Sequence, residues 1–330
     1  MNTQWCYDNF QLAFLEKKLY SIEEKIIAWF RDIVRRISAQ RLLISIPFLW
    51  MFVFFVCPCL ILIRISFSEP TIASPPYTEL FDWVSGNILQ LRLNFGNYIT
   101  LFTNEMYIRG FFTSMLIAGA STLCCLMIGF PMAYAIARSS EKSQKILLML
   151  IVLPFWTSFL IRVYAWIILL SPSGLINSWL MRFGIIDTPL PLMNNSYAAC
   201  LGIVYAYLPF MIFPLYGAIE KINYSLIEAA YDLGCTPIKA FFSVVVPLSM
   251  PGVYAGSALV FIPAIGEYVI PELLGGSQTL TVGRLVWNEF FGNLSWPTAA
   301  ALSIVLLLFV VLPVTFSQRR KEIKLLTRES

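Results

Sequence analysis

The sequence predicts an all-α integral membrane protein with six transmembrane helices and an amphipathic helix before them. Of its 330 residues, 58% are hydrophobic and 13% are charged, and an ordinary soluble domain carries about 25% charged residues. Residues 42–63 contain no charge at all, and roughly 20 apolar residues are needed for a helix to cross a bilayer. Further apolar runs of similar length continue almost to the C-terminus.

The first expected element is an amphipathic helix within residues 1–41. Apolar residues recur there every three or four positions, with many charges between them. Such a helix either lies on the inner leaflet of the membrane or packs against the bundle. The apolar positions are Leu12, Leu15, Leu19, Ile22, Ile26, Trp29, Ile33 and Ile37.

Six membrane spans follow and define a transmembrane domain over residues 42–317. The first is followed by Arg64 and bulky residues rather than by a small-residue cleavage site, so it is expected to remain as an anchor. The spans are expected at about 42–63, 110–137, 146–171, 197–219, 248–273 and 298–317.

The long connection 64–109 follows the first span. Its prolines Pro70, Pro75 and Pro76 argue against a continuous helix. Its charges are mainly acidic, and it either contacts an extracytoplasmic partner or serves as a solvated connector.

The orientation follows from the lysine and arginine count, because cytoplasmic loops are enriched in these residues. Seventeen of the 23 lie in 1–41, 138–145, 220–247 and the tail 318–330, whereas five lie on the opposite side. Both termini and the 220–247 loop are therefore expected in the cytoplasm.

Several chemistries are excluded by composition. The sequence has no histidine and no GxxxxGK[ST] stretch, which removes His-based triads, HExxH metal sites and ATP binding by a P-loop. The seven cysteines lack zinc-ligand spacing and are expected to be small packing residues. No catalytic residue, metal site or cofactor is predicted on the chain, a membrane enzyme is disfavoured, and the net charge of +4 gives no reason to expect nucleic acid.

The most informative segment is EAAYDLGCTPIKAFFSVVVPLSMPG, Glu228 to Gly252. It predicts a helix, a turn at Gly234 and a second helix that begins at Pro237. Ala229 and Ala230 are small, so a partner can approach them closely. Glu228 and Asp232 are four apart and share one helix face, which suits basic groups on that partner.

This segment resembles the cytoplasmic loop of bacterial ABC-transporter permeases of the importer type. Their pattern is EAA, three residues, glycine, nine residues and then Ile-x-Leu-Pro. Here Gly234 has the required spacing from Glu228, and Val244-Val245-Val246-Pro247 closes the pattern with valines in place of isoleucine and leucine. The resemblance implies the type I ABC-importer permease fold and a place in a bacterial inner membrane.

The resemblance also implies partners and the sites that meet them. A cytoplasmic ABC ATPase dimer, which holds ATP and magnesium, is expected to grip the coupling residues of the loop. An extracytoplasmic binding protein and a different second permease are expected to complete the transporter within the lipid membrane. The coupling residues are Glu228, Ala229, Ala230, Asp232, Gly234, Pro237 and Pro247.

Four further stretches resemble the polyamine branch of this family, which carries spermidine and putrescine. They are Pro154 to Trp166, Ile186 to Met193, Tyr207 to Ile222 and Pro263 to Gly276, the last of which looks more like the putrescine-type subunit. The transported amine is left open between putrescine, spermidine and another small cation.

A polyamine site needs carboxylates for the ammonium groups and aromatic faces for the methylene stems. Glu267, Tyr268 and Glu272 meet this need near the outer end of the fifth span, where Pro271 is expected to interrupt the helix. Trp156 and Tyr164 in the third span are candidates for lining the pathway nearby. The competing role for the carboxylates is an interface with the second membrane subunit or the external binding protein, and such aromatic residues more often form a lipid-facing belt than line a pathway.

Arg162 lies inside the third span, where a charge is costly and calls for a role. It would repel a cationic substrate, so a structural or gating role is expected, either through a pair with Glu267 or by reaching outward to the membrane surface.

A transporter driven by an ion gradient is the alternative reading. It would use Arg162 and Glu267 as its coupling pair. Six spans without an evident inverted repeat are few for such a protein.

Overall fold

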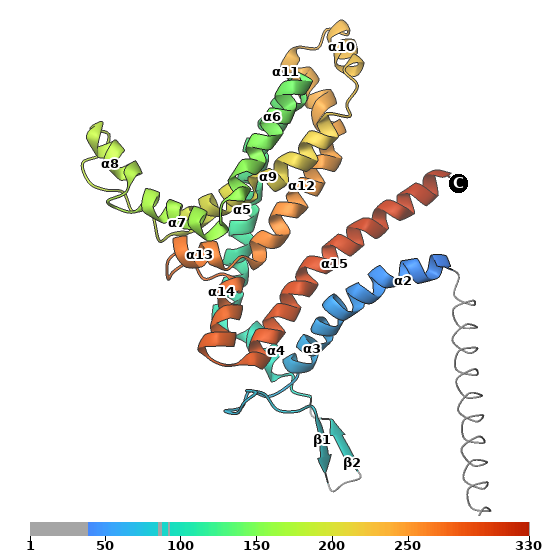
Figure 1. Ribbon diagram of the computed structural model, residues 1–330, viewed down its shortest axis with the longest axis vertical. Coiled ribbons are helices and arrows are strands. Elements are labelled where there is room, and N and C mark those ends of the chain that lie inside the picture. The colour runs from blue at the N-terminus through green and yellow to red at the C-terminus, as the bar shows by residue number, and fades with distance from the viewer. Residues whose placement is uncertain (1–38, 85–87, 92, 330) are drawn as a thin grey trace, which may run out of the picture. The chain divides into compact units, whose positions relative to one another are not determined.

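The computed structural model describes residues 39–84, 88–91 and 93–329. The chain divides into two compact units, Met1–Ile61 and Leu62–Ser330, and their elements are labelled in Figure 1. The amphipathic helix expected within residues 1–41 lies almost wholly outside the described residues.

The first predicted span is confirmed as one helical run. It consists of α2 (Ala39–Met51), the π-helix η1 (Phe52–Val56) and α3 (Cys57–Ser66). The π-turn comes directly before Pro58, which has no N–H to continue the α-helical hydrogen bonds, and the Cys57 N–H reaches back to the Phe52 carbonyl instead.

The connection after α3 is partly ordered rather than one helix, as its prolines predicted. It contains an antiparallel hairpin, which the sequence did not predict, of β1 (Phe81–Val84) and β2 (Ile88–Leu91), with Phe81 opposite Leu91. A short helix α4 (Gly96–Thr103) follows. Asn97 Nδ2 donates to the carbonyls of Ser66 and Ser68, both at 2.9 Å, and so attaches α4 to the end of α3.

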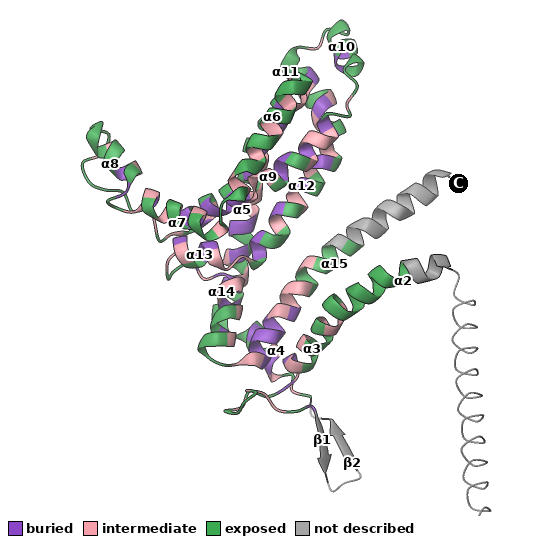
Figure 2. Cartoon of the chain, in the orientation of Figure 1, coloured by how far each residue is buried: buried purple, intermediate pink, exposed green. Residues whose placement is uncertain are grey.

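Three long helices form the centre of the second unit: α5 (Glu105–Ala137), α9 (Ser196–Ile219) and α12 (Val246–Gly266). Asn104 and Asn195 cap the first turns of α5 and α9 by accepting from the backbone N–H of Met106 and Ala198. All three pack against one another, and buried residues are most frequent along α9 (Figure 2).

Small residues allow this close packing. A Cβ on Gly252 of α12 would lie 2.6 Å from the Pro214 carbonyl oxygen of α9, and one on Gly256 would lie 2.8 Å from Met211 Sδ. The two glycines are four residues apart and therefore face α9 together, in the small-xxx-small arrangement typical of membrane helices.

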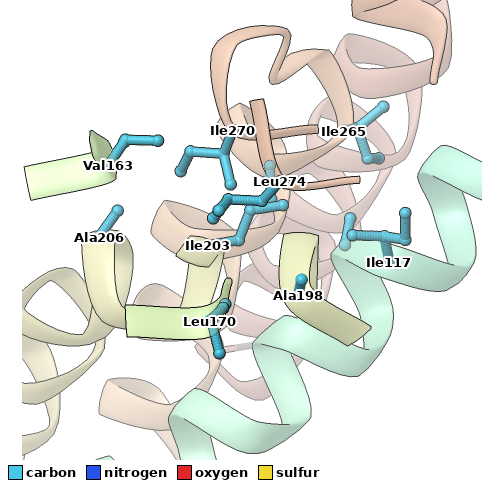
Figure 3. Packing of buried hydrophobic residues seen from close by; sticks show 11 residues of the cluster. Ile117, Val163, Leu170, Ala198, Ile203, Ala206, Ile265, Ile270 and Leu274 are labelled. Carbon is cyan, nitrogen blue, oxygen red and sulfur yellow. The ribbon is translucent and has the colours of Figure 1, made fainter. Parts of the chain in front are cut away.

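The buried side chains form separate clusters along the bundle. One cluster lies near the end of α12, where Ile203 and Ala206 of α9 meet Val163, Ile265 and Ile270 (Figure 3). A second lies in the other half of α5, α9 and α12 around Met211, Ile212 and Leu215.

The third predicted span, 146–171, is wrong as a single helix. It is divided into α6 (Glu141–Val152), a 3-10 turn η2 (Leu153–Trp156) and α7 (Phe159–Leu170), and α8 (Leu175–Arg182) follows. Pro154 tightens the turn and Thr157 takes an extended conformation, so the helix stops there.

The fifth predicted span, 248–273, begins earlier and ends earlier than expected. The helical run is α11 (Pro237–Ala240), the π-helix η3 (Phe241–Val245) and α12. It ends at Gly266 because Glu267 has an extended conformation. Pro271 therefore does not cause the break; it lies within the next helix, α13 (Val269–Leu274), where its missing N–H is harmless in the first turn.

The chain then returns through α14 (Val282–Trp287) and the π-helix η4 (Asn288–Gly292) to the last helix, α15 (Trp296–Glu329). The sixth span lies within α15, which continues through the tail predicted as a separate segment from residue 318. Six helical stretches in the described part of the chain are long and apolar enough to cross a membrane.

Candidate functional site

The predicted helix–turn–helix is present between α9 and α12. Its first helix, α10 (Ser225–Asp232), ends in a Schellman turn: the Gly234 N–H donates to the Tyr231 carbonyl at 2.8 Å, and the Cys235 N–H donates to the Ala230 carbonyl at 3.0 Å. Gly234 has φ +83°, a conformation that a side chain would strain. These contacts set the angle between the two helices of the loop.

The second helix of the loop starts as predicted at Pro237. Thr236 caps it by accepting from the Lys239 N–H at 3.4 Å, and Pro237 occupies the first position, where no N–H is needed. Pro247, at the end of the motif, is exposed in the first turn of α12.

The outward face of this coupling loop (Ser225–Val245) combines acidic and apolar groups. Glu228, Ala229 and Asp232 are exposed, as expected for a docking face. Leu233 is 86% exposed and Ile238 is 73% exposed, which the sequence reading did not single out. The loop can therefore offer carboxylates and a large apolar contact to a partner.

Ala230 corrects one expectation. It is 8% exposed and, together with Ile227, forms the inner face of α10. Its small side chain serves packing within the chain, so Ala229 alone of the two alanines is open to a partner.

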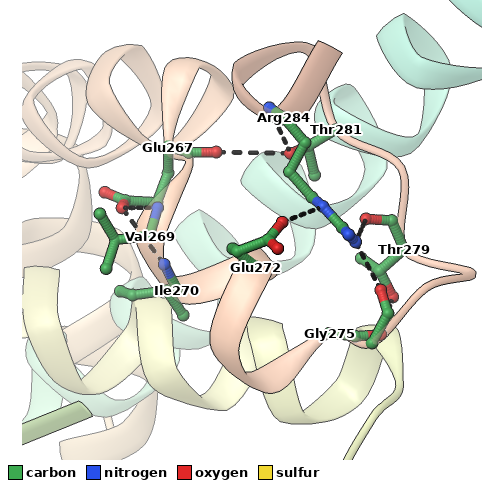
Figure 4. A network of polar contacts seen from close by, with 9 residues as sticks. Glu267, Val269, Ile270, Glu272, Gly275, Thr279, Thr281 and Arg284 are labelled. Carbon is green, nitrogen blue, oxygen red and sulfur yellow. Dashed lines mark hydrogen bonds and ion pairs between the residues drawn. The ribbon is translucent and has the colours of Figure 1, made fainter. Parts of the chain in front are cut away.

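Glu267, Tyr268 and Glu272 follow the end of α12 that is opposite to the coupling loop. Glu267 and Glu272 take part there in a network of polar contacts (Figure 4). Glu267 Oε1 accepts from the N–H groups of Val269 and Ile270 at 3.1 and 3.4 Å, and Oε2 accepts from the Tyr207 hydroxyl at 2.7 Å. The carboxylate thus satisfies the first turn of α13 and joins it to α9.

Glu272 is paired within the chain. Its Oε2 lies 2.5 Å from Arg284 Nε, with side chains that are 38% and 13% exposed respectively. Arg284 Nη1 also donates to the carbonyls of Gly276 and Thr279, at 2.5 and 3.1 Å. Arg284 therefore joins α14 to α13 and to the turn between them, where Gly276 has φ +68°.

Tyr268 is stacked on an aromatic neighbour. Its ring lies 4.6 Å from that of Trp287 at 15°, and Trp287 lies 4.2 Å from Phe291. Burial, followed by the nearby Glu272 carboxylate, raises the pKa of the Tyr268 phenol, so the ring stays neutral at physiological pH. Trp287 and Phe291 are both exposed.

Arg162 is not paired with Glu267 in the described part of the chain. Its guanidinium carbon lies 4.8 Å from the Phe155 ring centroid and 5.9 Å from that of Phe159. Its Nε is buried and makes no hydrogen bond to the described residues. Of the two predicted alternatives for Arg162, the pair with Glu267 is therefore not formed, and the rings of Phe155 and Phe159 partly replace that counter-charge.

Trp156 and Tyr164 are not drawn into the Glu267 network. They are 75% and 54% exposed, on η2 and α7, and no ring contact joins either of them to the described residues of α13 or α14. The sequence predicted them near Glu267. α7 does pack against α13 through the buried Val163, but Tyr164 is exposed on another side of α7, and Trp156 is exposed before the break at Thr157.

Three residues that matter to this network were missed from the sequence: Tyr207, Arg284 and Trp287. No local spacing indicates them, because each contact joins segments that are distant in sequence or separated by an irregular turn. For Glu267 the sequence did hold a signal, because a carboxylate close to the start of a helix often accepts from its first N–H groups.

Comparisons with known proteins agree with this arrangement. Residues 26–318 match the model of the family described as binding-protein-dependent transport system inner membrane component. The chain is 37% identical over 290 residues to the spermidine/putrescine transport system permease protein PotB of Haemophilus influenzae, which covers 88% of this chain and 96% of that protein. It is also 37% identical over 257 residues to PotB of Escherichia coli K12, covering 78% and 88%.

Solved structures show the same fold. A bacterial ABC transporter involved in the import of the acidic polysaccharide alginate matches with a TM-score of 0.58 and 21% identity, over 87% of this chain and 99% of that chain. The same transporter in complex with a pentasaccharide-bound periplasmic protein matches with a TM-score of 0.59 and 20% identity.

The fold and the coupling loop define a multi-pass inner-membrane permease of the ABC-importer type. The chain belongs to the family of binding-protein-dependent transport system inner membrane components. This membership gives no support to the alternative of a transporter driven by an ion gradient.

Proposed function

We propose that this chain is a permease subunit of an ATP-driven importer that carries polyamines, putrescine or spermidine, across the inner membrane. The observation that carries the substrate class is the 37% identity, over 88% of the chain, to a permease named for spermidine and putrescine transport. The exposed carboxylates of the coupling loop support the ATP-driven mechanism, because they suit docking to a motor protein.

The proposal includes three partners. A cytoplasmic ABC ATPase dimer holds ATP and magnesium and docks on the coupling loop, so the permease itself needs no cofactor. A second, different permease subunit pairs with this chain, and an extracytoplasmic binding protein delivers the amine. The lysine and arginine bias supports cytoplasmic positions for both termini, and hence for residues 1–41 and 318–330.

Alternating access then follows from linked binding equilibria. ATP on the motor and the loaded binding protein outside each favour one state of the bundle by their differential affinity. The coupling loop continues directly into α12, whose other end leads through Glu267 into α13. Movement of the loop is therefore carried to the network at the far end of the bundle.

We assign the far network to the outer mouth of the pathway. Glu272 is partly exposed and is held by Arg284 of α14, and the exposed aromatic residues Trp287 and Phe291 follow Arg284 in α14 and η4. Our proposal assigns the carboxylate to an ammonium group and the aromatic rings to the methylene stems. Glu267 and Tyr268 hold this surface in place, and Arg162 is assigned a structural or gating role because it bears the same charge as the substrate.

The test is uptake in proteoliposomes that contain the complete complex. With loaded binding protein outside and ATP inside, labelled putrescine or spermidine should accumulate. An ATPase whose P-loop lysine is replaced should abolish uptake, and an uncoupler should leave uptake unchanged. Accumulation that continues without ATP hydrolysis but stops with the uncoupler would contradict the proposal, and so would transport of neither amine.

A further inference from the structure

A single stripe of α5 holds both ends of the coupling loop. Phe130 and Tyr134 of α5 and its C-cap residue Arg138 are spaced four residues apart, so their side chains lie on one face. The Arg138 guanidinium carbon lies 4.5 Å from the ring centroid of Tyr224, which directly precedes α10. The ring of Phe241, which directly follows α11, meets Phe130 and Tyr134 edge-on at 5.5 and 5.3 Å.

The loop between these two anchors is internally rigid. Ile227 and Ala230 of α10 are buried, as are Ala240 and Val245 at the start of the next helical run. The Schellman turn and the Thr236 cap join the two helices. When a docked partner displaces the exposed face of α10, we therefore expect the whole loop to move as one body.

The chain of the coupling loop continues directly into α12, but no covalent connection joins the loop directly to α5. At its C-terminal end, α5 continues covalently into α6, which starts at Glu141 after a short turn. The contacts of Tyr224 and Phe241 thus give the loop a direct, non-covalent grip on the last two turns of α5. Because α5 packs on both α9 and α12, a displacement of its end changes both helix interfaces.

We infer that the α5 stripe and its two anchors, Tyr224 and Phe241, form a clamp that transmits movement of the coupling loop to α5. Arg138 and Tyr224 are positioning residues in this clamp, since neither faces the polar network at the far end of the bundle. The inference rests on the proposed function of the coupling loop, and it adds a second route into the bundle beside the direct connection to α12.

The clamp is tested by a double-mutant cycle in the complete reconstituted complex. The variants are Arg138→Gln, Tyr224→Leu and the two combined, and the readouts are amine moved per ATP hydrolysed and the stimulation of ATP hydrolysis by loaded binding protein. A cation–π contact at an exposed site supports an effect of about two- to fivefold for each single variant. Arg138→Gln removes the contacts of the guanidinium with both Tyr134 and Tyr224, whereas Tyr224→Leu removes the second contact alone. The double variant should therefore be no worse than Arg138→Gln.

Two controls separate transmission from simple support of the structure. Tyr224→Phe keeps the ring and should retain normal coupling. Lys142→Gln removes an exposed charge close to Arg138 in sequence and should have no effect. All variants should co-purify with the ATPase in normal amount.

The clamp is refuted if the double variant loses coupling by the product of the two single-variant factors, which would show that the residues act independently. It is also refuted if coupling is unchanged in both single variants, or if Tyr224→Phe and Tyr224→Leu reduce coupling equally. Loss of assembly in Tyr224→Leu would also refute it, because the contact would then hold the loop rather than transmit its movement. A wild-type complex that hydrolyses ATP on meeting its binding protein but moves neither amine contradicts the proposed substrate. The stimulation of ATP hydrolysis still reports on the clamp in that case.

Discussion

At the scale of single residues, the carboxylates of Glu267 and Glu272 at the far end of the bundle have different partners. Glu267 is used within the chain, with three hydrogen-bond donors around it. Glu272 is held by Arg284 but remains 38% exposed on its side chain. Of the two, Glu272 is the carboxylate that an incoming ammonium group can reach without breaking a helix start.

Arg284 should matter to stability more than its place in a connecting segment suggests. Arg284→Gln removes the ion pair with Glu272 and weakens the hydrogen bonds to two carbonyls, at a site where the arginine is only 13% exposed. We expect a loss of about 1–3 kcal/mol, at the lower end because Glu272 stays partly hydrated. This is measured as a lower apparent melting temperature in detergent.

Arg109→Gln is the matched control for this prediction. Arg109 pairs with Glu105 one helical turn away, and both side chains are largely exposed. Such a pair contributes about 0.3–0.5 kcal/mol, so its loss should hardly change the melting temperature. Equal effects of the two substitutions would contradict the role given to Arg284.

At the scale of elements, glycine decides the geometry of the coupling loop and of the α9–α12 interface by two different mechanisms. Gly234 is required for its positive φ and not for space, because a Cβ there would meet no atom within 4 Å. Gly252 is required for space, since its Cβ would lie 2.6 Å from atoms of α9. Gly217 has neither constraint and serves as a control for both.

Gly234→Ala should distort the loop without disturbing the bundle. An alanine in the left-handed region costs about 1 kcal/mol, which corresponds to about fivefold weaker docking of the ATPase if the loop must keep this turn. Titration of purified ATPase onto the permease in nanodiscs measures this, and Gly217→Ala should leave the affinity unchanged. Unchanged docking in Gly234→Ala would show that the turn is not needed.

Gly252→Ala should weaken the bundle itself. The new methyl group would collide with the Pro214 carbonyl and the Ala218 methyl group, and such overpacking costs typically about 1–3 kcal/mol. The apparent melting temperature of the permease should fall, whereas Gly217→Ala should leave it unchanged or raise it slightly, because alanine favours helix. A fall of equal size in both variants would contradict close packing at Gly252.

At the scale of the whole molecule, the sequence predicted the membrane helices well and their interruptions poorly. Hydropathy located all six stretches, because the cost of burying backbone in lipid makes long apolar helices unavoidable. The spacing of Gly234 and Pro237 also predicted the coupling loop, since both residues act through local backbone geometry. The Gly252-x-x-x-Gly256 pattern was available as a packing signal and was overlooked.

The rest depends on contacts between distant segments. The ends of the third and fifth spans were misplaced because Pro154 and Glu267 stop helices inside apolar runs, where hydropathy does not change. The pairing of Glu272 with Arg284 needs the turn between α13 and α14, and the Glu267 to Tyr207 contact joins α12 to α9. No pattern along a single helix predicts such contacts.

The last prediction concerns the orientation of the whole chain in the membrane. Seventeen lysines and arginines lie on the side of the coupling loop, against five on the other side, and this bias predicts a cytoplasmic position for the loop. Cys235 is half-buried within the loop, and Asn293 is exposed between η4 and α15, beyond the far end of the bundle. A membrane-impermeant maleimide should therefore reach these two positions from opposite sides.

The experiment uses the permease expressed without its ATPase, so that the loop is uncovered. In a Cys6→Ser background, Cys235 should react in inside-out vesicles and not in intact spheroplasts. With Cys235→Ser and Asn293→Cys the pattern should reverse, because the remaining cysteines lie in the apolar spans, where a charged reagent does not enter. Labelling of Cys235 from outside the cell would place the coupling loop where no ATPase can reach it, and the ATP-driven mechanism would have to be abandoned.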